Sequence, residues 1–477
     1  MTLSLFEAKQ GGGIMEESLA RVIEYPGSAA QTASPRPEEE TSDSRRAVEG
    51  REGDFLDRLA RGGAGEERLY LELKRISKQV EALRAGNRWE EVVDLLHPAE
   101  EKAPELAEAG LAGYLRSEAA FALGHLARFD EAIALYQRCL EDEPDDFRLN
   151  AGLAYTAYDS LYAAKGRRIA LHPAERKLRI ELAHRHFAAA QALRPRGVAN
   201  YYRQGMLYKQ IENKREKAMP LFETAVRNWE SLSDEEKGNR EKDRKNYVKS
   251  LYQLASCQLD ANRPSRALES LRKCLEEDEG VGTYSAVHKY FALGKVHYHA
   301  GSLKKALEAL ETAAVRGDPA EDDYVFELQA RVHLAAGDPA KAWEAVSRVP
   351  LKRRRPYVRW TEGDILLELG DADGARRVLR EAAGKDRRGR HKALMRLARL
   401  EFRLDRYEEC LDCSVQADEF FRGCYKAPCQ DGLFWKAAAL FRLGRIPEAA
   451  EAAEELDKVR PNYPHLQRLR QFIASAS

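Results

Sequence analysis

The sequence predicts an all-α protein built from repeated pairs of helices. Three observations support this fold class: apolar residues recur at the helical period from about Leu69 onward, small residues recur at fixed spacing, and glycine or asparagine separates the paired segments. At 477 residues the chain exceeds one ordinary domain. It is therefore expected to form either several domains or a repeat array.

The clearest unit is the stretch 286–318. Two amphipathic segments flank the residues 299–302; the first carries Gly294 and the second carries Ala306, twelve positions later, followed by Ala313 after seven more. Small side chains at this spacing let two helix backbones approach closely. The stretch is therefore expected to fold as a rigid helical hairpin.

The same spacing recurs along most of the chain. Pairs of small residues twelve positions apart are Ala120/Ala132, Ala255/Ala267, Gly294/Ala306, Ala330/Ala342, Gly363/Ala375, Ala398/Cys410 and Ala437/Ala449. Turns between the paired helices are expected at Asn87, Asn262, Gly301, Gly337, Gly370 and Gly444. Two longer intervals carry insertions at 161–178 and 233–245, which are expected to fall at turns.

The two ends of the chain read differently from the repeats. Residues 1–68 contain Gly-, Pro- and acid-rich stretches that predict a disordered tail, with one short helical island at 15–24. That island could dock on a partner or on the protein itself, or have no role. At the other end, residues 463–477 place Leu466, Leu469 and Ile473 on one face, which predicts a capping helix.

The repeats resemble a known family. The segments RFDEAIALYQRCLEDEPDD (128–146) and RYEECLDCSVQAD (406–418) are similar to the second helix of the tetratricopeptide repeat. The resemblance implies a right-handed superhelical solenoid of antiparallel helix hairpins over 69–462, with about nine to ten repeats. Such solenoids bind protein segments, and their first helices line the concave groove.

Carried onto this chain, the resemblance implies a peptide-binding groove in which aromatic and basic side chains alternate. Several of these aromatic residues could instead pack between neighbouring helices. Members of the family that bind a C-terminal carboxylate use Lys and Asn residues on successive first helices. That pattern is not found in this sequence. The expected groove residues are Tyr202, Lys209, Lys249, Tyr252, His288, Phe291, Lys295, Tyr298, Tyr324, Arg331, Tyr357, Trp360, Lys392, Arg399 and Phe402.

A basic block at 352–406 offers an alternative function. It holds 17 Lys/Arg against nine Asp/Glu, although the whole chain has 78 of each and zero formal net charge. Interleaved with aromatic residues, the block could track the phosphates of RNA or DNA. It could equally attract an acidic protein segment, or form solvated outer faces of helices.

Four cysteines near the C-terminus form a possible zinc site: Cys410, Cys413, Cys424 and Cys429. Four thiolates can bind zinc tetrahedrally. However, Cys410 occupies a small-residue position that holds alanine in the sister repeats. Packing is therefore the simpler interpretation, and no cofactor is expected.

Catalytic motifs are not found: there is no Gly-rich phosphate loop, no metalloprotease helix and no serine elbow. The chain start lacks the pattern of a secretory signal, and no stretch is apolar enough for a membrane span, so a cytoplasmic location is expected. The sequence therefore predicts a noncatalytic scaffold or adaptor. Its expected partner is an extended or helical protein segment carrying acidic residues.

Overall fold

A computed structural model of the chain describes residues 64–476, and within that range it contains helices and no strand. The described residues form two compact units, 64–283 and 284–476, which are treated separately below. The expected island at 15–24 lies outside the described residues. The first described helix begins at Ala64, five residues before the expected start of the repeats.

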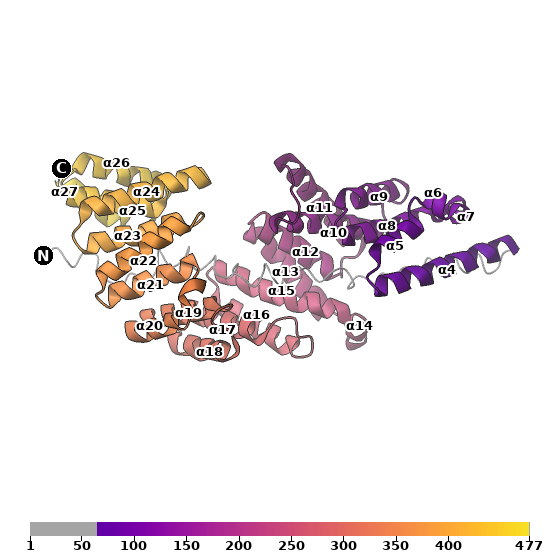
Figure 1. Cartoon of the computed structure of the whole chain (residues 1–477), viewed down its shortest axis with the longest axis horizontal. Coiled ribbons are helices and arrows are strands. Elements are labelled where there is room, and N and C mark those ends of the chain that lie inside the picture. The colour runs from indigo at the N-terminus through magenta and orange to yellow at the C-terminus, as the bar shows by residue number, and fades with distance from the viewer. Residues whose placement is uncertain (1–63, 477) are drawn as a thin grey trace. The chain divides into compact units, whose positions relative to one another are not determined.

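The N-terminal unit contains five helix pairs that follow one another in the chain (Figure 1). Short helical turns and one extra helix connect some of them. Its elements are α4 (Ala64–Ala85), α5 (Trp89–Leu96), α6 (Ala99–Lys102), α7 (Pro104–Leu106), η3 (Ala107–Leu111), α8 (Ala112–His125), α9 (Phe129–Asp142), α10 (Phe147–Lys165), α11 (Pro173–Leu193), α12 (Ala199–Met206), η4 (Leu207–Ile211), α13 (Arg215–Glu230), α14 (Asp234–Asn239), α15 (Glu241–Asp260) and α16 (Pro264–Asp278).

The C-terminal unit is more regular, with five helix pairs stacked in chain order and one final helix. Each second helix also contacts the first helix of the following pair. Its elements are α17 (Ala286–His299), α18 (Leu303–Arg316), α19 (Asp323–Ala335), α20 (Pro339–Ser347), η5 (Leu351–Arg353), α21 (Pro356–Glu368), α22 (Ala372–Lys385), α23 (Arg390–Arg403), α24 (Tyr407–Tyr425), α25 (Gln430–Arg442), α26 (Ile446–Val459) and α27 (Leu466–Ala476).

The turn within each pair uses a residue in the left-handed backbone region. Gly301 has φ of 72° and Gly337 has φ of 77°, and Asn262 has φ of 55°. After α17, the amide of Ser302 donates to the carbonyl of His297 at 2.9 Å and so closes the helix end. Glycine and asparagine adopt this backbone conformation at little steric cost, which explains their place at the turns.

The small residues lie where paired helices touch. A Cβ atom on Gly294 would stand 2.5 Å from Cγ of Leu310 on the partner helix α18. A Cβ atom on Gly363 would stand 2.6 Å from Cγ of Leu379 on α22. Ala306 is fully buried in the same way. The predicted hairpin packing through small side chains is thus present in the structure.

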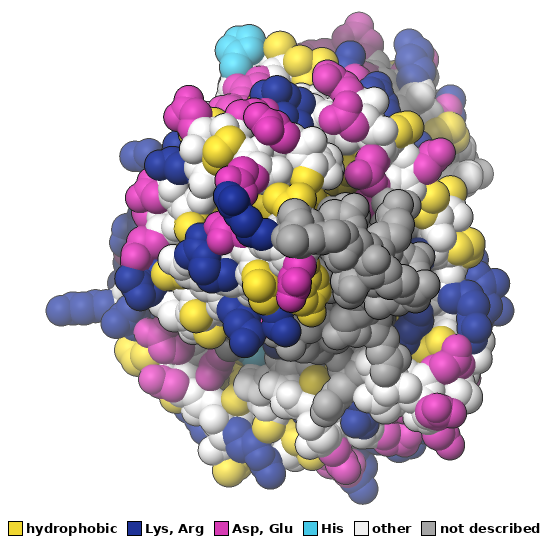
Figure 2. Space-filling view, turned by 90° about the vertical axis from the view of Figure 1, so that its right-hand side faces the viewer, with side chains coloured by type: hydrophobic (Ala, Val, Ile, Leu, Met, Phe, Trp, Pro, Cys, Tyr) yellow, Lys and Arg dark blue, Asp and Glu magenta, His cyan; other side chains and the backbone are white. Residues whose placement is uncertain are grey.

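Apolar cores run between the helices of each unit. In the C-terminal unit the largest cluster extends over α21–α27 and includes Leu379, Leu397, Trp435 and Leu456. Helix α27 contributes the three residues Leu466, Leu469 and Ile473, all at most 4% exposed, to that cluster. On the surface, acidic and basic side chains lie interspersed over the described residues of the face seen in Figure 2.

The two insertions have different structures. Residues 233–245 were expected at a turn, but they form helix α14 and the start of α15. Ser233 begins α14 with a reciprocal cap, in which its hydroxyl accepts from the amide of Glu236 at 3.2 Å. In the other insertion, 166–172 forms a loop between α10 and α11.

Among residues 64–476, the structure contains no helix long and apolar enough to cross a membrane.

Candidate functional site

The first helices of the C-terminal unit contact one another through polar side chains about one repeat apart. The hydroxyl of Tyr357 on α21 donates to Asp323 on α19 at 2.6 Å. Thr361 on α21 likewise donates to Glu327 on α19 at 2.6 Å. We call the side chains that link α17, α19, α21 and α23 in this way the first-helix face. Its members are Asp323, Glu327, Arg331, Tyr357, Trp360, Thr361, Asp364, Lys392, Arg396 and Arg399.

Two buried carboxylates lie at the centre of this face. Asp323 is fully buried and Glu327 is 3% exposed. Burial raises the pKa of both carboxyl groups, because the charged form loses its hydration. Each has one oxygen, Oδ2 of Asp323 and Oε2 of Glu327, with no hydrogen-bond partner among the described residues. Buried polar atoms in proteins are usually bonded, so these two need an explanation.

Cationic side chains flank the carboxylates. Arg331 lies 3.8 Å from Glu327 and its Nη1 atom also has no hydrogen-bond partner among residues 64–476. One repeat further, Arg396 on α23 donates to Asp364 on α21 at 2.9 Å. Burial lowers the pKa of the neighbouring Arg399. The face therefore carries carboxylates on α19 and α21 and cations on α23, with Arg331 on α19 beside Glu327.

An aromatic ring lies within this charged row. The indole of Trp360 is flanked by Lys392 and Arg396, whose cationic groups each stand 5.5 Å from the ring centroid. Cations at this distance from an indole are attracted by its electron-rich face. The side chain of Trp360 is 8% exposed and packs in the core cluster, so the ring contributes to the floor of the face rather than projecting from it.

Most of the aromatic residues expected in the groove pack within the units. Phe291 and Tyr324 meet edge to face, with ring centroids 4.7 Å apart, inside the core of α17–α19. Tyr298 belongs to the same core, and Phe402 packs against Trp435. Tyr357 is half-buried with its hydroxyl on Asp323. These rings stabilise the stacking of the first helices.

The expected groove residues of the N-terminal unit are also engaged internally. Lys209 is 2% exposed, and its ammonium group donates to Gln253 at 2.8 Å and to Ser256 at 2.7 Å. Tyr202 packs beside Phe222. Lys249 and Tyr252 lie half-buried on α15. This set does not form a row of opposite charges like the one on α19–α23.

Two further expected residues lie on α17. His288 is half-buried and its Nδ1 atom lies 2.6 Å from the hydroxyl of Ser285, which caps the helix. Lys295 is 2% exposed. Arg331, with its guanidinium 5.6 Å from the ring centroid of Tyr298, connects α17 to α19. Of the expected residues, Arg331, Tyr357, Trp360, Lys392 and Arg399 therefore share the first-helix face.

The acidic half of this face was not anticipated. The sequence analysis selected aromatic and basic residues for the groove. It therefore did not include the acidic residues Asp323, Glu327 and Asp364, nor Thr361, which donates to Glu327. A signal was available in the sequence: Glu327 and Thr361 are 34 positions apart, and Asp364 and Arg396 are 32 apart, close to one repeat. Complementary polar residues at the repeat interval indicate contact between successive first helices.

The basic block at 352–406 is extensively paired with carboxylates. Arg354 and Arg359 both bind Glu362, at 2.9 and 2.7 Å. Arg376 donates to Glu401 at 2.6 Å, and Arg403 to Glu368 at 2.7 Å. These pairs cancel much of the positive charge that phosphates would otherwise meet. The structure thus weakens the basis for the nucleic-acid alternative.

The four cysteines of the possible zinc site occupy different environments. Cys410 and Cys429 are buried, Cys413 is intermediate and Cys424 is exposed. No group of three or more His, Cys, Asp or Glu side chains suited to a metal ion occurs within residues 64–476. Cys410 fills the small-residue position against α25, with no exposed surface. This placement matches the packing interpretation.

Sequence comparison agrees with the repeat geometry. A family described as "Tetratricopeptide repeat-like domain" matches residues 222–409, and a second, described as "Tetratricopeptide repeat", matches residues 431–455. This chain therefore contains tetratricopeptide repeats. The family fold accounts for the paired helices, the small residues between them and the contacts between successive first helices. No curated protein matches the chain in sequence.

Solved structures of similar fold include a tetratricopeptide repeat protein from Parabacteroides merdae, 12% identical, covering 57% of this chain and 99% of that one, with a TM-score of 0.43. PilF of Pseudomonas aeruginosa is 20% identical over 50% of this chain and 96% of its own, with a TM-score of 0.35. A Naa15/Naa10 complex bound to HypK-THB is 16% identical over 97% and 79%, with a TM-score of 0.41. At these scores the likenesses carry no functional information.

Proposed function

We propose that this tetratricopeptide-repeat protein is a noncatalytic scaffold or adaptor that binds an extended protein segment along its first-helix face. The observation that supports this proposal most strongly is the row of opposite charges, with carboxylates on α19 and α21 and cations on α23. Within it, the ion pair of Asp364 and Arg396 remains partly open to a ligand, with 34% and 14% of the two side chains exposed. An extended backbone carries both donors and acceptors, so one such segment offers partners for atoms of both kinds.

The charges favour a segment of mixed sign. A lysine, an arginine or a backbone amide would meet Asp364, the carboxylate of the row that is partly exposed. Acidic side chains would lie near Lys392, Arg396 and Arg399, as the sequence led us to expect. Because complementary charges set register and association rate, the binding is expected to weaken with increasing salt.

The environment of the protein is proposed from its thiols. None of the seven cysteines, all of which lie within the described residues, is joined in a disulfide. Cysteines in such number without a disulfide suit a reducing compartment, and we propose the cytoplasm.

Site-specific photocrosslinking tests the position of the bound segment. A photoreactive amino acid at 392 would lie on the first-helix face, whereas one at 377 would lie on the exposed side of α22. We expect the 392 variant to form crosslinks to a distinct protein partner that the 377 variant does not form. Identical crosslinked species from both positions would contradict the proposal.

A further inference from the structure

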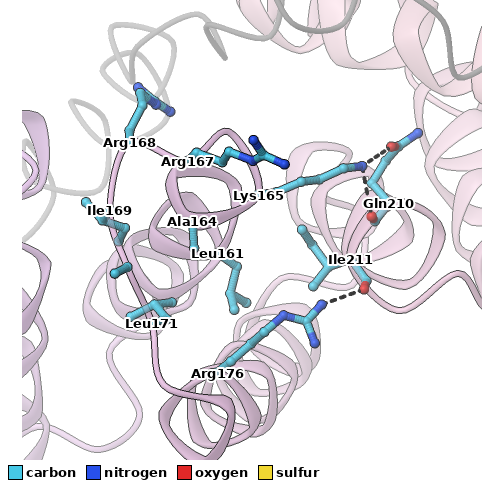
Figure 3. A pocket seen from close by; sticks show the side chains of 11 residues that line it. Leu161, Ala164, Lys165, Arg167, Arg168, Ile169, Leu171, Arg176, Gln210 and Ile211 are labelled. Atoms are coloured by element: carbon cyan, nitrogen blue, oxygen red, sulfur yellow. Dashed lines mark hydrogen bonds between the residues drawn. The ribbon is translucent and has the colours of Figure 1, made fainter. Parts of the chain in front are cut away.

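The N-terminal unit contains a cavity that the first-helix face does not involve. It has a volume of about 730 Å³ and lies between the 166–172 loop and the π-helical turn η4 (Figure 3). This volume is within the usual range for binding sites of ligands or peptide side chains. Its apolar lining consists of Leu161, Ala164, Ile169, Ala170, Leu171 and Ile211.

Two cations hold the walls of this cavity together. The ammonium group of Lys165, at the end of α10, donates to the carbonyl of Gln210 at 3.0 Å and to its side-chain oxygen at 2.7 Å. The guanidinium of Arg176 on α11 donates to the carbonyl of Ile211 at 2.8 Å. Both groups therefore fix η4 against the helix pair.

Two further arginines lie on the loop itself. Arg167 and Arg168 are exposed, and no carboxylate occurs among the residues that line the cavity. In Figure 3 the Arg167 side chain extends toward that of Lys165, whereas Arg168 points outward from the loop. Four cations thus surround an apolar floor without an acidic side chain among the lining residues.

Acidic groups close by in the chain have other partners. Glu212 bonds to His184 at 2.8 Å and also forms an ion pair with Lys214. Glu175 accepts from Arg179 at 2.6 Å. These carboxylates are therefore engaged elsewhere, and the positive charge of the loop remains available to a negatively charged ligand.

We propose that this cavity binds an acidic segment of a partner protein that inserts one apolar side chain. The carboxylates would meet Arg167 and Arg168, and the apolar side chain would cover the floor formed by Leu161, Leu171 and Ile211. A nucleic acid is disfavoured because the lining contains no aromatic ring on which a base could stack. The apolar floor and the charge of the loop together specify an acidic, amphipathic peptide.

This site does not depend on the proposed function of the first-helix face, because it lies in the other unit. A random peptide library displayed on phage is selected on the full chain, on Arg167→Glu/Arg168→Glu and on the control Arg266→Glu/Arg272→Glu. The control changes the same charge at two exposed positions of α16. Thermal unfolding of the three proteins checks that each remains folded.

We expect the full chain and the control to enrich peptides with acidic residues beside a leucine or aromatic residue. Synthetic copies of these peptides should bind the loop variant at least about tenfold more weakly, since hydrogen bonds to charged groups contribute this much to affinity. Enriched peptides that bind the loop variant and the control equally would overturn the proposal. So would failure to enrich any peptide of this class, or an oligothymidine probe whose binding is lost in the loop variant alone.

Discussion

The hydroxyl of Tyr357 donates a 2.6 Å hydrogen bond to Asp323, and so connects the first helices of two successive repeats. Asp323 is fully buried and also lies 3.6 Å from Nε of Arg355. Burial raises the pKa of Tyr357, as it does that of Asp323. Of these two neighbours of the Asp323 carboxylate, the Tyr357 hydroxyl makes the shorter contact.

Replacing Tyr357 by phenylalanine is expected to lower the free energy of unfolding by about 1–3 kcal/mol, because a buried carboxylate loses a hydrogen-bond donor. Chemical denaturation measures the effect. Tyr425→Phe is the control. The Tyr425 hydroxyl donates to the carbonyl of Arg388 at 3.2 Å, and the Tyr425 side chain is 39% exposed. Equal losses of unfolding free energy in the two variants would show that the buried Tyr357–Asp323 hydrogen bond stabilises the protein no more than the exposed one does.

Two glycines of one hairpin offer a matched test of the packing. A Cβ atom at Gly363 would meet Leu379 at 2.6 Å, whereas at Gly384 on α22 it would meet nothing within 4 Å. Gly363→Ala is expected to destabilise the protein by about 1–3 kcal/mol through overpacking. Gly384→Ala should stabilise it by about 0.5–1 kcal/mol, because it restricts the unfolded chain. Melting temperatures that shift in the same direction would contradict this account.

The stability is expected to depend on pH through His299. Burial lowers its pKa from 6.5 to about 4, and Lys295 and Arg331 add to the effect. Above pH 6.5 the imidazole is neutral in both states. As pH falls from 6.5 toward 4, the unfolded chain takes up a proton that the folded protein does not, so stability is lost over this window.

The variant His299→Gln lacks this titration. The free energy of unfolding of the natural chain, relative to the variant, should therefore fall between pH 6.5 and about 4 and stay level above pH 7. Thermal unfolding over a pH series measures the difference. A difference that does not change with pH would show that His299 titrates alike in both states.

The cysteines should differ strongly in reactivity. Cys424 is exposed, whereas burial raises the pKa of Cys410 to about 12 and that of Cys413 to about 11. Only the thiolate reacts with iodoacetamide, so Cys424 should be alkylated first under native conditions. Peptide mapping by mass spectrometry gives the order. Protection of Cys424 that a zinc chelator removes would instead indicate a metal site.

The hairpins could be predicted from sequence because their determinants are local. The spacing of Gly294 and Ala306, and glycine at turn positions such as Gly301, follow from helix geometry and from the left-handed backbone region. The same reasoning missed helix α14, because 233–245 is an insertion between repeats and was expected to fall at a turn. The reciprocal cap between Ser233 and Glu236 instead begins a helix.

The candidate site was predicted less completely, because it depends on contacts between repeats. The sequence pointed to Trp360, which lies against Lys392 and Arg396 of the next first helix, but it did not predict how deeply this ring or that of Phe402 would pack. It also gave no weight to Asp323 or Glu327, whose importance comes from burial without a full set of partners. Pairing of polar residues at the repeat interval identifies such sites better than aromatic and basic composition.

A charge swap tests the role of the first-helix face most directly. Asp364 and Arg396 form an ion pair at 2.9 Å, with 34% and 14% of their side chains exposed. The double variant Asp364→Arg/Arg396→Asp retains an ion pair but exchanges the positions of its positive and negative charges, so a ligand meets the opposite charge at each position. The control Arg422→Glu/Glu455→Arg makes the same exchange between α24 and α26, where the pair is 2.5 Å apart.

The decisive measurement is affinity capture of protein partners, after nuclease treatment, with the natural chain and both swapped variants at equal folded concentration. We predict that the natural chain and the α24–α26 control retain the same partner, and that the Asp364→Arg/Arg396→Asp variant loses it. Retention of that partner by the Asp364→Arg/Arg396→Asp variant, or its loss on nuclease treatment alone, would contradict binding of a protein segment at the first-helix face.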